Sequence, residues 1–186
     1  MDNGACSYRR FRDSGDESGL DEIIREYRDS LTLYLANIAG DLGTAEELAE
    51  DTFVLLGIRK PRFKGKSSFK TWLYSIGRNI ALDHLRKQKR HPRIPLDELP
   101  EQSGAADAVE REYLRKERDI TLHRAMRKLN PEYRQVLWLI YFEGFSSKEA
   151  AGVMRRTVRG LESVLYRAKK SLKAQLETEG FDYEEL

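Results

Sequence analysis

Cysteine is almost absent from this sequence, since Cys6 is the only one among 186 residues. A single cysteine excludes an internal disulfide and a metal site built on cysteine. The three histidines, His84, His91 and His123, do not fall at ligand spacing. The sequence therefore predicts no metal site and no bound cofactor.

Long apolar runs are also lacking. No run of about eighteen apolar residues occurs, and the first ten residues, MDNGACSYRR, have no apolar core of the kind found in signal peptides. We therefore expect a cytoplasmic protein without membrane insertion. Stretches of alternating apolar and polar residues are missing too, so strands are not predicted.

Charge is plentiful and unevenly distributed. The 33 Lys and Arg nearly balance the 31 Asp and Glu, for a net charge of +2. Residues 20–58 carry nine acids against two arginines, residues 59–93 twelve basic residues against Asp83, and residues 124–175 twelve against four acids. This pattern suggests a polyanion bound at two places and a basic protein surface met by the acidic block. For any single block, a solvated helix face is the alternative.

Apolar residues recur at steps of three and four along most of the chain, which predicts an all-α protein. In the N-terminal half, helices are expected from Leu20 to Ile38, after a capping box of Thr44 and Glu47, and from Phe69 to Arg90 behind a Ser67 or Ser68 cap. Residues 1–18, rich in Gly, Ser and Asp, predict a disordered tail. Residues 91–107, with three prolines and a glycine, predict a flexible linker. The chain would thus hold two small helical domains, 19–90 and 108–178, followed by a tail of residues 179–186.

The C-terminal domain has the pattern of a helix-turn-helix. A helix from Pro131 to about Phe142, capped by Asn130, precedes a capping box of Ser146 and Glu149 that opens a short helix ending near Met154. A longer basic helix then runs from about Thr157 to Leu176. In such a motif the second helix enters the major groove of DNA. Hairpins in ordinary helical bundles show the same bare pattern, so DNA binding is one of two readings.

The stretch PRFKGKSSFKTW, residues 61–72, combines three lysines and an arginine with three aromatic residues and no acid. A phosphate-binding loop is disfavoured, because one glycine is too few and no strand precedes it. A platform on which single-stranded bases stack, or a solvated basic loop, remains.

Two longer segments resemble a known family. FKGKSSFKTWLYSIGRNIALDHLRKQKR resembles the promoter-melting region of bacterial sigma factors, and AMRKLNPEYRQVLWLIYFEGFSSKEAAGVM resembles their C-terminal promoter-binding region. With the acidic GTAEELAEDTF ahead of the first, and a linker in place of a third domain, the chain resembles the extracytoplasmic-function (ECF) class from about Leu20 to Leu176.

The resemblance implies three sets of contacts. Core RNA polymerase would be bound at its clamp by Glu46, Glu47, Glu50, Asp51 and Phe53, and also at its flap. The melted minus-ten strand would meet Phe63, Lys64, Lys66, Ser67, Asn79, Asp83 and Arg86. The minus-thirty-five duplex would meet Arg155, Arg156, Arg159, Ser163, Tyr166, Arg167 and Lys170. Because family members are often held inactive by an anti-sigma factor, such a factor is a further candidate partner.

Two of these assignments carry alternatives, and the reader helix departs from the family pattern at two positions. Phe53 also fits the core. Asp83, alone among twelve basic residues, is either an ion-pair partner within the chain or an acceptor for a base edge. Glu162 and Val164 stand where the family commonly has a lysine and an arginine, which predicts weak duplex binding by the domain alone.

The predicted function is that of a sigma initiation factor, which performs no covalent chemistry and has no catalytic residues. Two other classes are weighed against it. A stand-alone helix-turn-helix regulator would bind duplex DNA tightly without polymerase. An enzyme acting on nucleic acid would need a carboxylate cluster or a placed general base, and neither Asp83 nor the histidines supply one.

Overall fold

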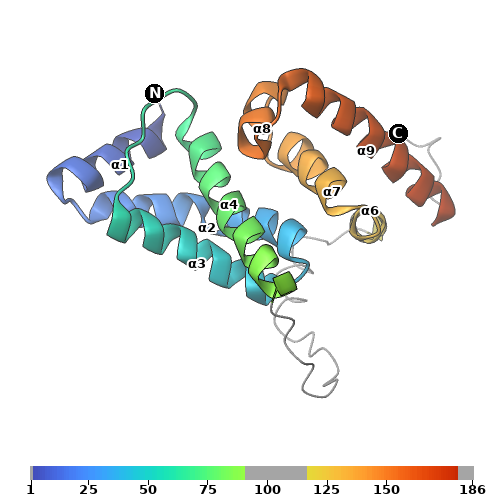
Figure 1. The fold of residues 1–186 in the computed structure, drawn as a ribbon, viewed down its shortest axis with the longest axis horizontal. Helices are drawn as coiled ribbons and strands as arrows, with labels where there is room; N and C mark the ends of the chain where they lie inside the picture. The colour runs from blue at the N-terminus through green and yellow to red at the C-terminus, as the bar shows by residue number, and fades with distance from the viewer. Residues whose placement is uncertain (1, 91–116, 180–186) are drawn as a thin grey trace, which may run out of the picture.

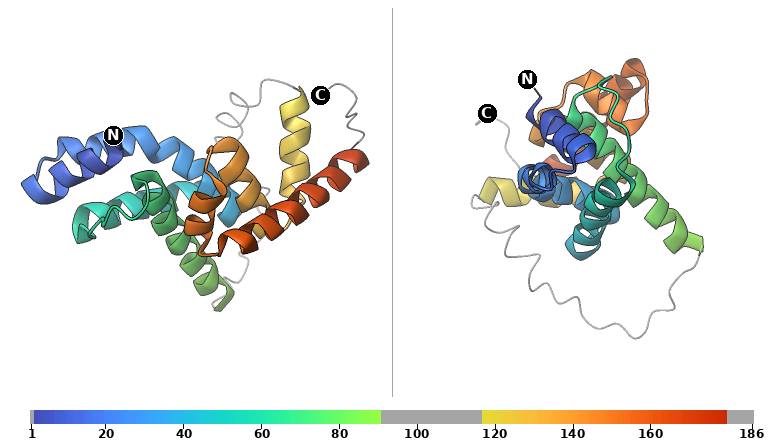
Figure 2. Two further views of the ribbon diagram at one scale, coloured as in Figure 1. Left: turned by 90° about the horizontal axis from the view of Figure 1, so that it is seen from above. Right: turned by 90° about the vertical axis from the view of Figure 1, so that its left-hand side faces the viewer.

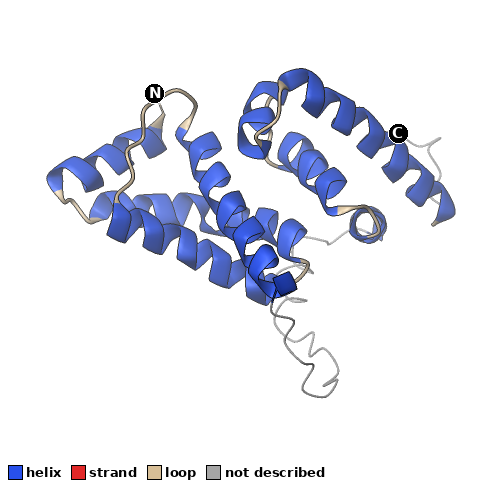
Figure 3. Ribbon diagram, in the orientation of Figure 1, coloured by secondary structure: helices blue, strands red, loops and turns tan. Residues whose placement is uncertain are grey.

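The computed structural model describes residues 2–90 and 117–179, and every regular element in those two ranges is helical (Figure 3). The elements are α1 (Asn3–Ser14), α2 (Ser18–Ala39), α3 (Leu42–Arg59), α4 (Phe69–Arg90), α6 (Glu117–Arg127), α7 (Pro131–Leu137), the π-helical turn η1 (Trp138–Phe142), α8 (Ser147–Met154) and α9 (Val158–Thr178) (Figure 1). The prediction of an all-α protein is confirmed. The predicted linker, 91–107, and all but the first residue of the C-terminal tail lie outside the described residues.

The N-terminal segment is a helix, so the prediction of a disordered tail over residues 1–18 is wrong. Asp2 caps α1, because its Oδ1 atom accepts a hydrogen bond of 3.1 Å from the amide of Ala5. Gly15, with φ of +69°, ends the helix in the left-handed conformation that glycine adopts without strain. Tyr8 and Phe11 are buried on one face of α1. Tyr8 and Phe11 are three residues apart, which is the spacing of a helix face. The polar composition of the segment made this helical pattern easy to overlook.

The helix caps correct one further prediction and decide between two alternatives of another. The N-cap of α3 is Asp41, which accepts a hydrogen bond of 2.7 Å from the amide of Thr44, so the expected capping box of Thr44 and Glu47 does not open this helix. At the start of α4, Ser68 is the cap, since its hydroxyl accepts from the amide of Thr71 at 3.2 Å. The bounds of α4 agree with the predicted ones.

In the N-terminal domain, α2 packs against α1 and α3, and α4 crosses α2 and α3 (Figures 1 and 2). The core of this domain includes the fully buried Leu31, Leu35 and Leu73. A Cβ atom at Gly77 would lie 3.1 Å from Leu31 Cδ1. Glycine therefore permits the close approach of α4 to α2.

The C-terminal domain confirms most of its predicted turns. Asn130 caps α7 with Pro131 in its first turn, and Ser146 and Glu149 form a reciprocal capping box at α8. One difference is that the predicted helix from Pro131 to Phe142 ends in the π-helical turn, in which the amide of Glu143 bonds to the carbonyl of Trp138 at 3.1 Å. This turn stacks the rings of Trp138 and Phe142 with centroids 4.4 Å apart.

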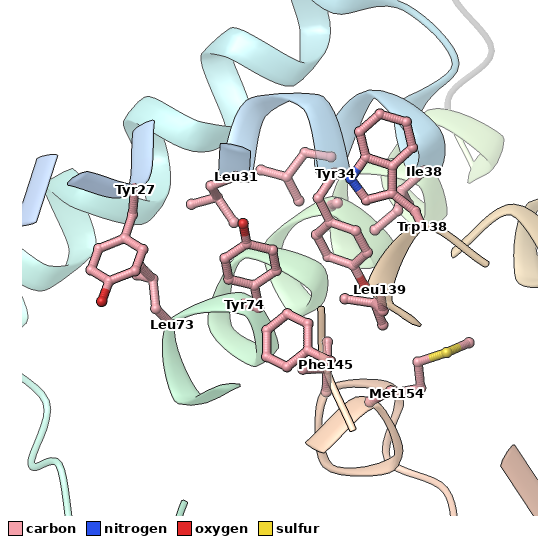
Figure 4. Close-up of a cluster of buried hydrophobic side chains, with 14 of the residues drawn as sticks. Tyr27, Leu31, Tyr34, Ile38, Leu73, Tyr74, Trp138, Leu139, Phe145 and Met154 are labelled. Atoms are coloured by element: carbon pink, nitrogen blue, oxygen red, sulfur yellow. The ribbon is translucent and has the colours of Figure 1, made fainter. Parts of the chain in front are cut away.

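The two domains share a continuous hydrophobic core (Figure 4). Tyr34 and Ile38 of α2 and Tyr74 of α4 meet side chains from η1 and the segment after it, among them Trp138 and Phe145. The rings of Tyr74 and Phe145 lie 5.2 Å apart in an edge-to-face arrangement. The domains are therefore packed against each other.

Candidate nucleic-acid and polymerase interfaces

The basic loop before α4 lies beside a cluster of three aromatic rings, those of Phe63, Phe69 and Trp72, which we call the aromatic seat. The ring of Phe63 is half-buried, 5.2 Å from the ring of Trp72 and 5.7 Å from that of Phe69. Phe69 is fully buried and anchors the helix, whereas Trp72 is half-buried at the edge of the core. Lys64 and Lys66 are exposed beside this seat, as are Gly65 and Ser67. Exposed ammonium groups around a part-exposed ring are the parts of a site for single-stranded nucleic acid.

Asn79, Asp83 and Arg86 follow along one side of α4, four and three residues apart. Asn79 is half-buried, and Asp83 and Arg86 are exposed. Asp83 Oδ1 accepts a hydrogen bond of 2.8 Å from Arg86 Nη1. The ion-pair alternative for Asp83 is therefore realised in this structure. The side chains are 63% and 68% exposed, so the pair adds little to stability and leaves the carboxylate open to another partner.

All the predicted contacts of the second DNA-binding surface are exposed: Arg155, Arg156, Arg159, Ser163, Tyr166, Arg167 and Lys170. Tyr166 is 71% exposed, which is unusual for so large a ring. Arg156 is engaged, because its guanidinium forms an ion pair with Glu132. Val164 is fully buried against the other helices of the domain, so its position is a core position and not one that faces DNA. Glu162 is exposed, as the expected repulsion of phosphate requires.

The acidic side of α3 is exposed at Glu46, Glu47, Glu50 and Asp51, but Phe53 is 6% exposed and belongs to the core. The predicted contact by Phe53 is thus replaced by the core alternative. Val54 and Ile58 are 54% and 78% exposed and continue the face of Glu47 and Glu50 along the helix. The sequence analysis missed this apolar extension, although both residues lie off the buried side of α3.

An apolar groove lies between α6, η1 and α9, with a volume of about 470 Å³. Its lining includes Leu122, Met126, Phe142 and Leu172, with Lys169 at its edge. Tyr141 is 56% exposed, and Lys169 Nζ lies 5.4 Å from the centroid of its ring. The sequence analysis did not identify this groove, because its walls come from three separate segments.

A polar cluster joins the two domains beside their shared core. The carboxylate of Glu143, 6% exposed, accepts hydrogen bonds from Tyr74 Oη at 2.7 Å and from Trp138 Nε1 at 3.1 Å, and Lys70 Nζ lies 2.9 Å from it. Burial, and then the charge of Glu143, raise the pKa of Tyr74, so its hydroxyl remains a donor.

Two further bonds cross the same interface. Arg78 Nε donates to Gln135 Oε1 at 2.9 Å, and Ser68 Oγ donates to Glu149 Oε1 at 3.3 Å. These contacts hold the N-terminal half of α4 against α7 and α8.

Residues 2–90 and 117–179 offer neither a metal site nor a membrane-spanning helix. No group of three His, Cys, Asp or Glu side chains in these ranges is placed to hold a metal ion. No helix described there combines the length and the apolar character needed to cross a membrane.

Comparison with known protein families matches both domains. Residues 23–91 match the family described as Sigma-70 region 2, and residues 120–172 match Sigma-70, region 4. The ECF RNA polymerase sigma factor SigM of Bacillus subtilis is 31% identical over 155 residues, which cover 83% of this chain and 93% of SigM. The RNA polymerase sigma-H factor of Pseudomonas aeruginosa is 27% identical over 173 residues, 88% of this chain and 89% of that protein.

Two solved structures have a similar fold. The sigma factor RpoE of Bartonella quintana, in complex with the anti-sigma factor NepR, superposes with a TM-score of 0.65 at 22% identity and covers 84% of this chain and 96% of its own. CnrH, in complex with the cytosolic domain of CnrY, gives a TM-score of 0.63 at 23% identity and covers 95% of this chain and 96% of its own. The likeness covers both helical domains.

Proposed function

Because this chain belongs to the ECF class of sigma factors, which are alternative factors for transcription initiation, we propose which surfaces it uses at a promoter. The loop of residues 61–68 and α4 capture the melted minus-ten strand, and the turn between α8 and α9, with α9 itself, reads the minus-thirty-five duplex. The observation that carries this proposal is the half-buried Phe63 ring, seated on Trp72 and flanked by the exposed Lys64 and Lys66.

The energetics of strand capture fit that seat. Extruding a base from the stack costs a few kcal/mol. Stacking on an aromatic side chain returns about 1–3 kcal/mol per base, and each lysine placed on the backbone adds the release of counterions. Asn79 and Asp83, about two and three turns along α4 from Trp72, offer amide and carboxylate groups to base edges.

The second surface binds duplex DNA through Arg155, Arg159, Ser163, Tyr166, Arg167 and Lys170, all exposed on the turn and on α9. Arg156 contributes less, because Glu132 already pairs with its guanidinium. Glu162 weakens the approach of phosphate from the same helix. We expect duplex binding by this domain alone to be weak and strongly dependent on salt.

Two surfaces fit core RNA polymerase. The acidic face of α3, from Glu46 to Asp51, suits a basic region of the clamp through charge-assisted hydrogen bonds, and the exposed Val54 and Ile58 extend it with apolar area. The apolar groove between α6, η1 and α9 suits the flap. In this proposal the polymerase supplies all covalent chemistry, the chain works in the cytoplasm, and an anti-sigma factor is a further partner.

The packed arrangement of the domains sets a condition on this function. The two promoter elements are named for their positions, minus ten and minus thirty-five, so they are about 25 base pairs apart. This separation is about 85 Å along B-DNA. Ser68 and Glu149 are in contact, and Asp83 lies fifteen residues along α4 from Ser68, about 22 Å. Tyr166 lies within about 34 Å of Glu149 along α8, the turn and α9. These two spans sum to less than the separation of the promoter elements. We therefore expect the two domains to separate when both promoter elements are bound.

The proposal is tested by in vitro transcription with purified core polymerase on a genomic DNA library. The wild-type chain should give promoter-specific transcripts. The double variant Phe63→Ala, Lys64→Ala should bind core polymerase normally but form open complexes at least about tenfold less well, because stacking and a phosphate contact are lost. Lys148→Ala, an equal loss of charge at an exposed position of the other domain, is the matched control.

Two outcomes would contradict the proposal. Unchanged open-complex formation by the double variant would refute strand capture by the loop. Tight duplex binding by the isolated chain, with no promoter-specific transcripts, would point to a regulator that acts without polymerase.

A further inference from the structure

We infer that α1 is part of the strand-capture site, in which Tyr8 and Asp2 are positioning residues that hold the two ends of the basic loop. This inference rests on the proposed role of Phe63 and the loop. The helix lies before residue 23, where the match to Sigma-70 region 2 begins. Its contacts with the loop converge on residues 60, 61 and 69.

The first end of the loop is held by α1 through two contacts. Tyr8 Oη donates a hydrogen bond of 2.7 Å to the carbonyl oxygen of Pro61. One residue earlier, the ammonium group of Lys60 lies 4.4 Å from the centroid of the Phe11 ring. Burial raises the pKa of Tyr8 to about 12, so the hydroxyl keeps its proton and remains a donor at neutral pH.

The second end of the loop is held by Asp2. Its Oδ2 atom accepts a hydrogen bond of 2.6 Å from the amide of Phe69, the first residue of α4. Its Oδ1 atom accepts from the amide of Ala5, in the first turn of α1. One carboxylate therefore caps two helices at once, and bonds of this kind to a charged acceptor are stronger than neutral ones.

Tyr8 also supports the aromatic seat from beneath. Its ring centroid lies 5.2 Å from that of Trp72 and 5.5 Å from that of Phe69, and Phe63 packs on the same two rings. The approach is close, because a Cβ atom at Gly4 would lie 2.6 Å from Phe69 Cδ1. The surface that receives a flipped base thus depends on α1 as well as on α4.

Between its ends the loop is held chiefly by the ring of Phe63, which packs on Phe69 and Trp72. In the described part of the chain, the peptide groups of residues 62–67 make no backbone hydrogen bonds to other backbone groups. A loop held at its two ends and at one ring keeps its shape only while those contacts are in place. Anchoring it in advance lowers the ordering cost of binding, which is what preorganisation contributes to affinity.

The test uses the full chain assembled with core polymerase and a fluorescent single-stranded oligonucleotide, selected from a random pool on the wild-type holoenzyme. Tyr8→Phe removes only the hydroxyl and keeps the ring. We expect it to bind the oligonucleotide about five- to tenfold more weakly, the size of one well-placed hydrogen bond. Affinity for core polymerase should stay at the wild-type value, and the melting temperature should fall by only the few degrees that one lost hydrogen bond costs.

Two controls separate positioning from general stability. Tyr34→Phe removes another buried hydroxyl of the same domain, one with no hydrogen-bond partner in the described residues, and should bind the oligonucleotide like wild type. Asp2→Asn keeps one of the two acceptor oxygens and loses the charge, so it can still cap one of the two helices and should lose less affinity than Asp2→Ala. Wild-type oligonucleotide binding by Tyr8→Phe would overturn the inference, and so would a loss of core polymerase binding as large as the loss of oligonucleotide binding.

Failure of this inference can be told from failure of the proposed function by the variant Phe63→Ala. If Phe63→Ala weakens oligonucleotide binding while Tyr8→Phe does not, only the role of α1 falls. If neither variant changes oligonucleotide binding, both the role of α1 and the strand-capture function of the loop are wrong.

Discussion

Tyr74 on α4 donates a hydrogen bond from its hydroxyl group to the carboxylate of Glu143, across the boundary between the two domains. The oxygen atoms Tyr74 Oη and Glu143 Oε2 are 2.7 Å apart. The same carboxylate lies 2.9 Å from Lys70 Nζ and is almost fully buried. A buried charge held by several donors gives an interface a specific geometry, and it is costly to leave those donors without their acceptor.

We expect Glu143→Ala to lower the free energy of unfolding by about 2–3 kcal/mol, because it leaves the Tyr74 hydroxyl and the Trp138 indole N–H without an acceptor and Lys70 without its charged partner. Urea unfolding followed by circular dichroism measures the change. Glu177→Ala is the matched control, since it removes a carboxylate from the exposed pair with Lys173 and should cost less than about 0.5 kcal/mol. An equal effect of the two variants would show that Glu143 has no special role in the interface.

Ser146→Ala should cost about 1 kcal/mol of stability through the loss of the α8 cap. The variant should also shift a titration. Hydrogen bonds from the side chain and backbone of Ser146 lower the pKa of Glu149 below its ordinary value of 4.5. A lowered folded-state pKa contributes stability that is present above pH 4.5 and is lost as the pH falls through the folded-state pKa.

The Ser146→Ala variant should therefore lose part of this acid-dependent stability, and carbon-detected NMR should show the pKa of Glu149 moving up toward 4.5. A pKa of Glu149 that is the same in both proteins would contradict the assignment of the shift to the cap.

Asp83→Ala should leave stability within about 0.5 kcal/mol of wild type, because its pair with Arg86 is exposed. If the carboxylate also accepts from a base edge, Asp83→Ala should change which base is preferred in the minus-ten strand. Arg86→Ala, which breaks the same pair, should weaken binding to all sequences alike. Binding of randomised oligonucleotides by the two variants measures this difference. If Asp83→Ala and Arg86→Ala have the same base preference, Asp83 serves only as the ion-pair partner of Arg86.

Glu162→Lys should tighten duplex DNA binding by the chain about five- to tenfold and make the logarithm of affinity fall more steeply with salt, by about one further phosphate contact. Glu177→Lys, the same charge change four turns further along α9, should have a much smaller effect. Fluorescence anisotropy at several salt concentrations measures both. Equal gains would mean that the effect comes from net charge and not from the position on the reading helix.

Local signals in the sequence were sufficient for several elements. The bounds of α4 follow from a serine cap and from the His91 and Pro92 that come after Arg90. The capping box of Ser146 and Glu149 is encoded within four residues, and so is the Asn130 and Pro131 start of α7. Signals of this kind need no information from the rest of the chain.

Other features depend on packing between distant segments. Tyr8 is a buried position because Phe69 and Trp72, more than sixty residues away, pack against its ring. Likewise, the burial of Phe53 and Val164 and the exposure of Val54 depend on which side of each helix the fold covers. Phe53 and Val54 are both apolar, so composition does not show which of the two is buried. A residue assigned to a binding surface from its place in a motif can therefore lie on the buried side of its helix.

The π-helical turn of Trp138–Phe142 is a difference in chain length as well as in geometry. A π-turn holds one residue more than the α-helical turn that it replaces, and each residue rotates an α-helix by about 100°. Deleting one residue there would restore the α-helical pitch and swing Glu143 away from Tyr74 and Lys70. In an alignment, a relative without that residue would show a single gap and otherwise matching side chains, yet it would lose this link between its domains.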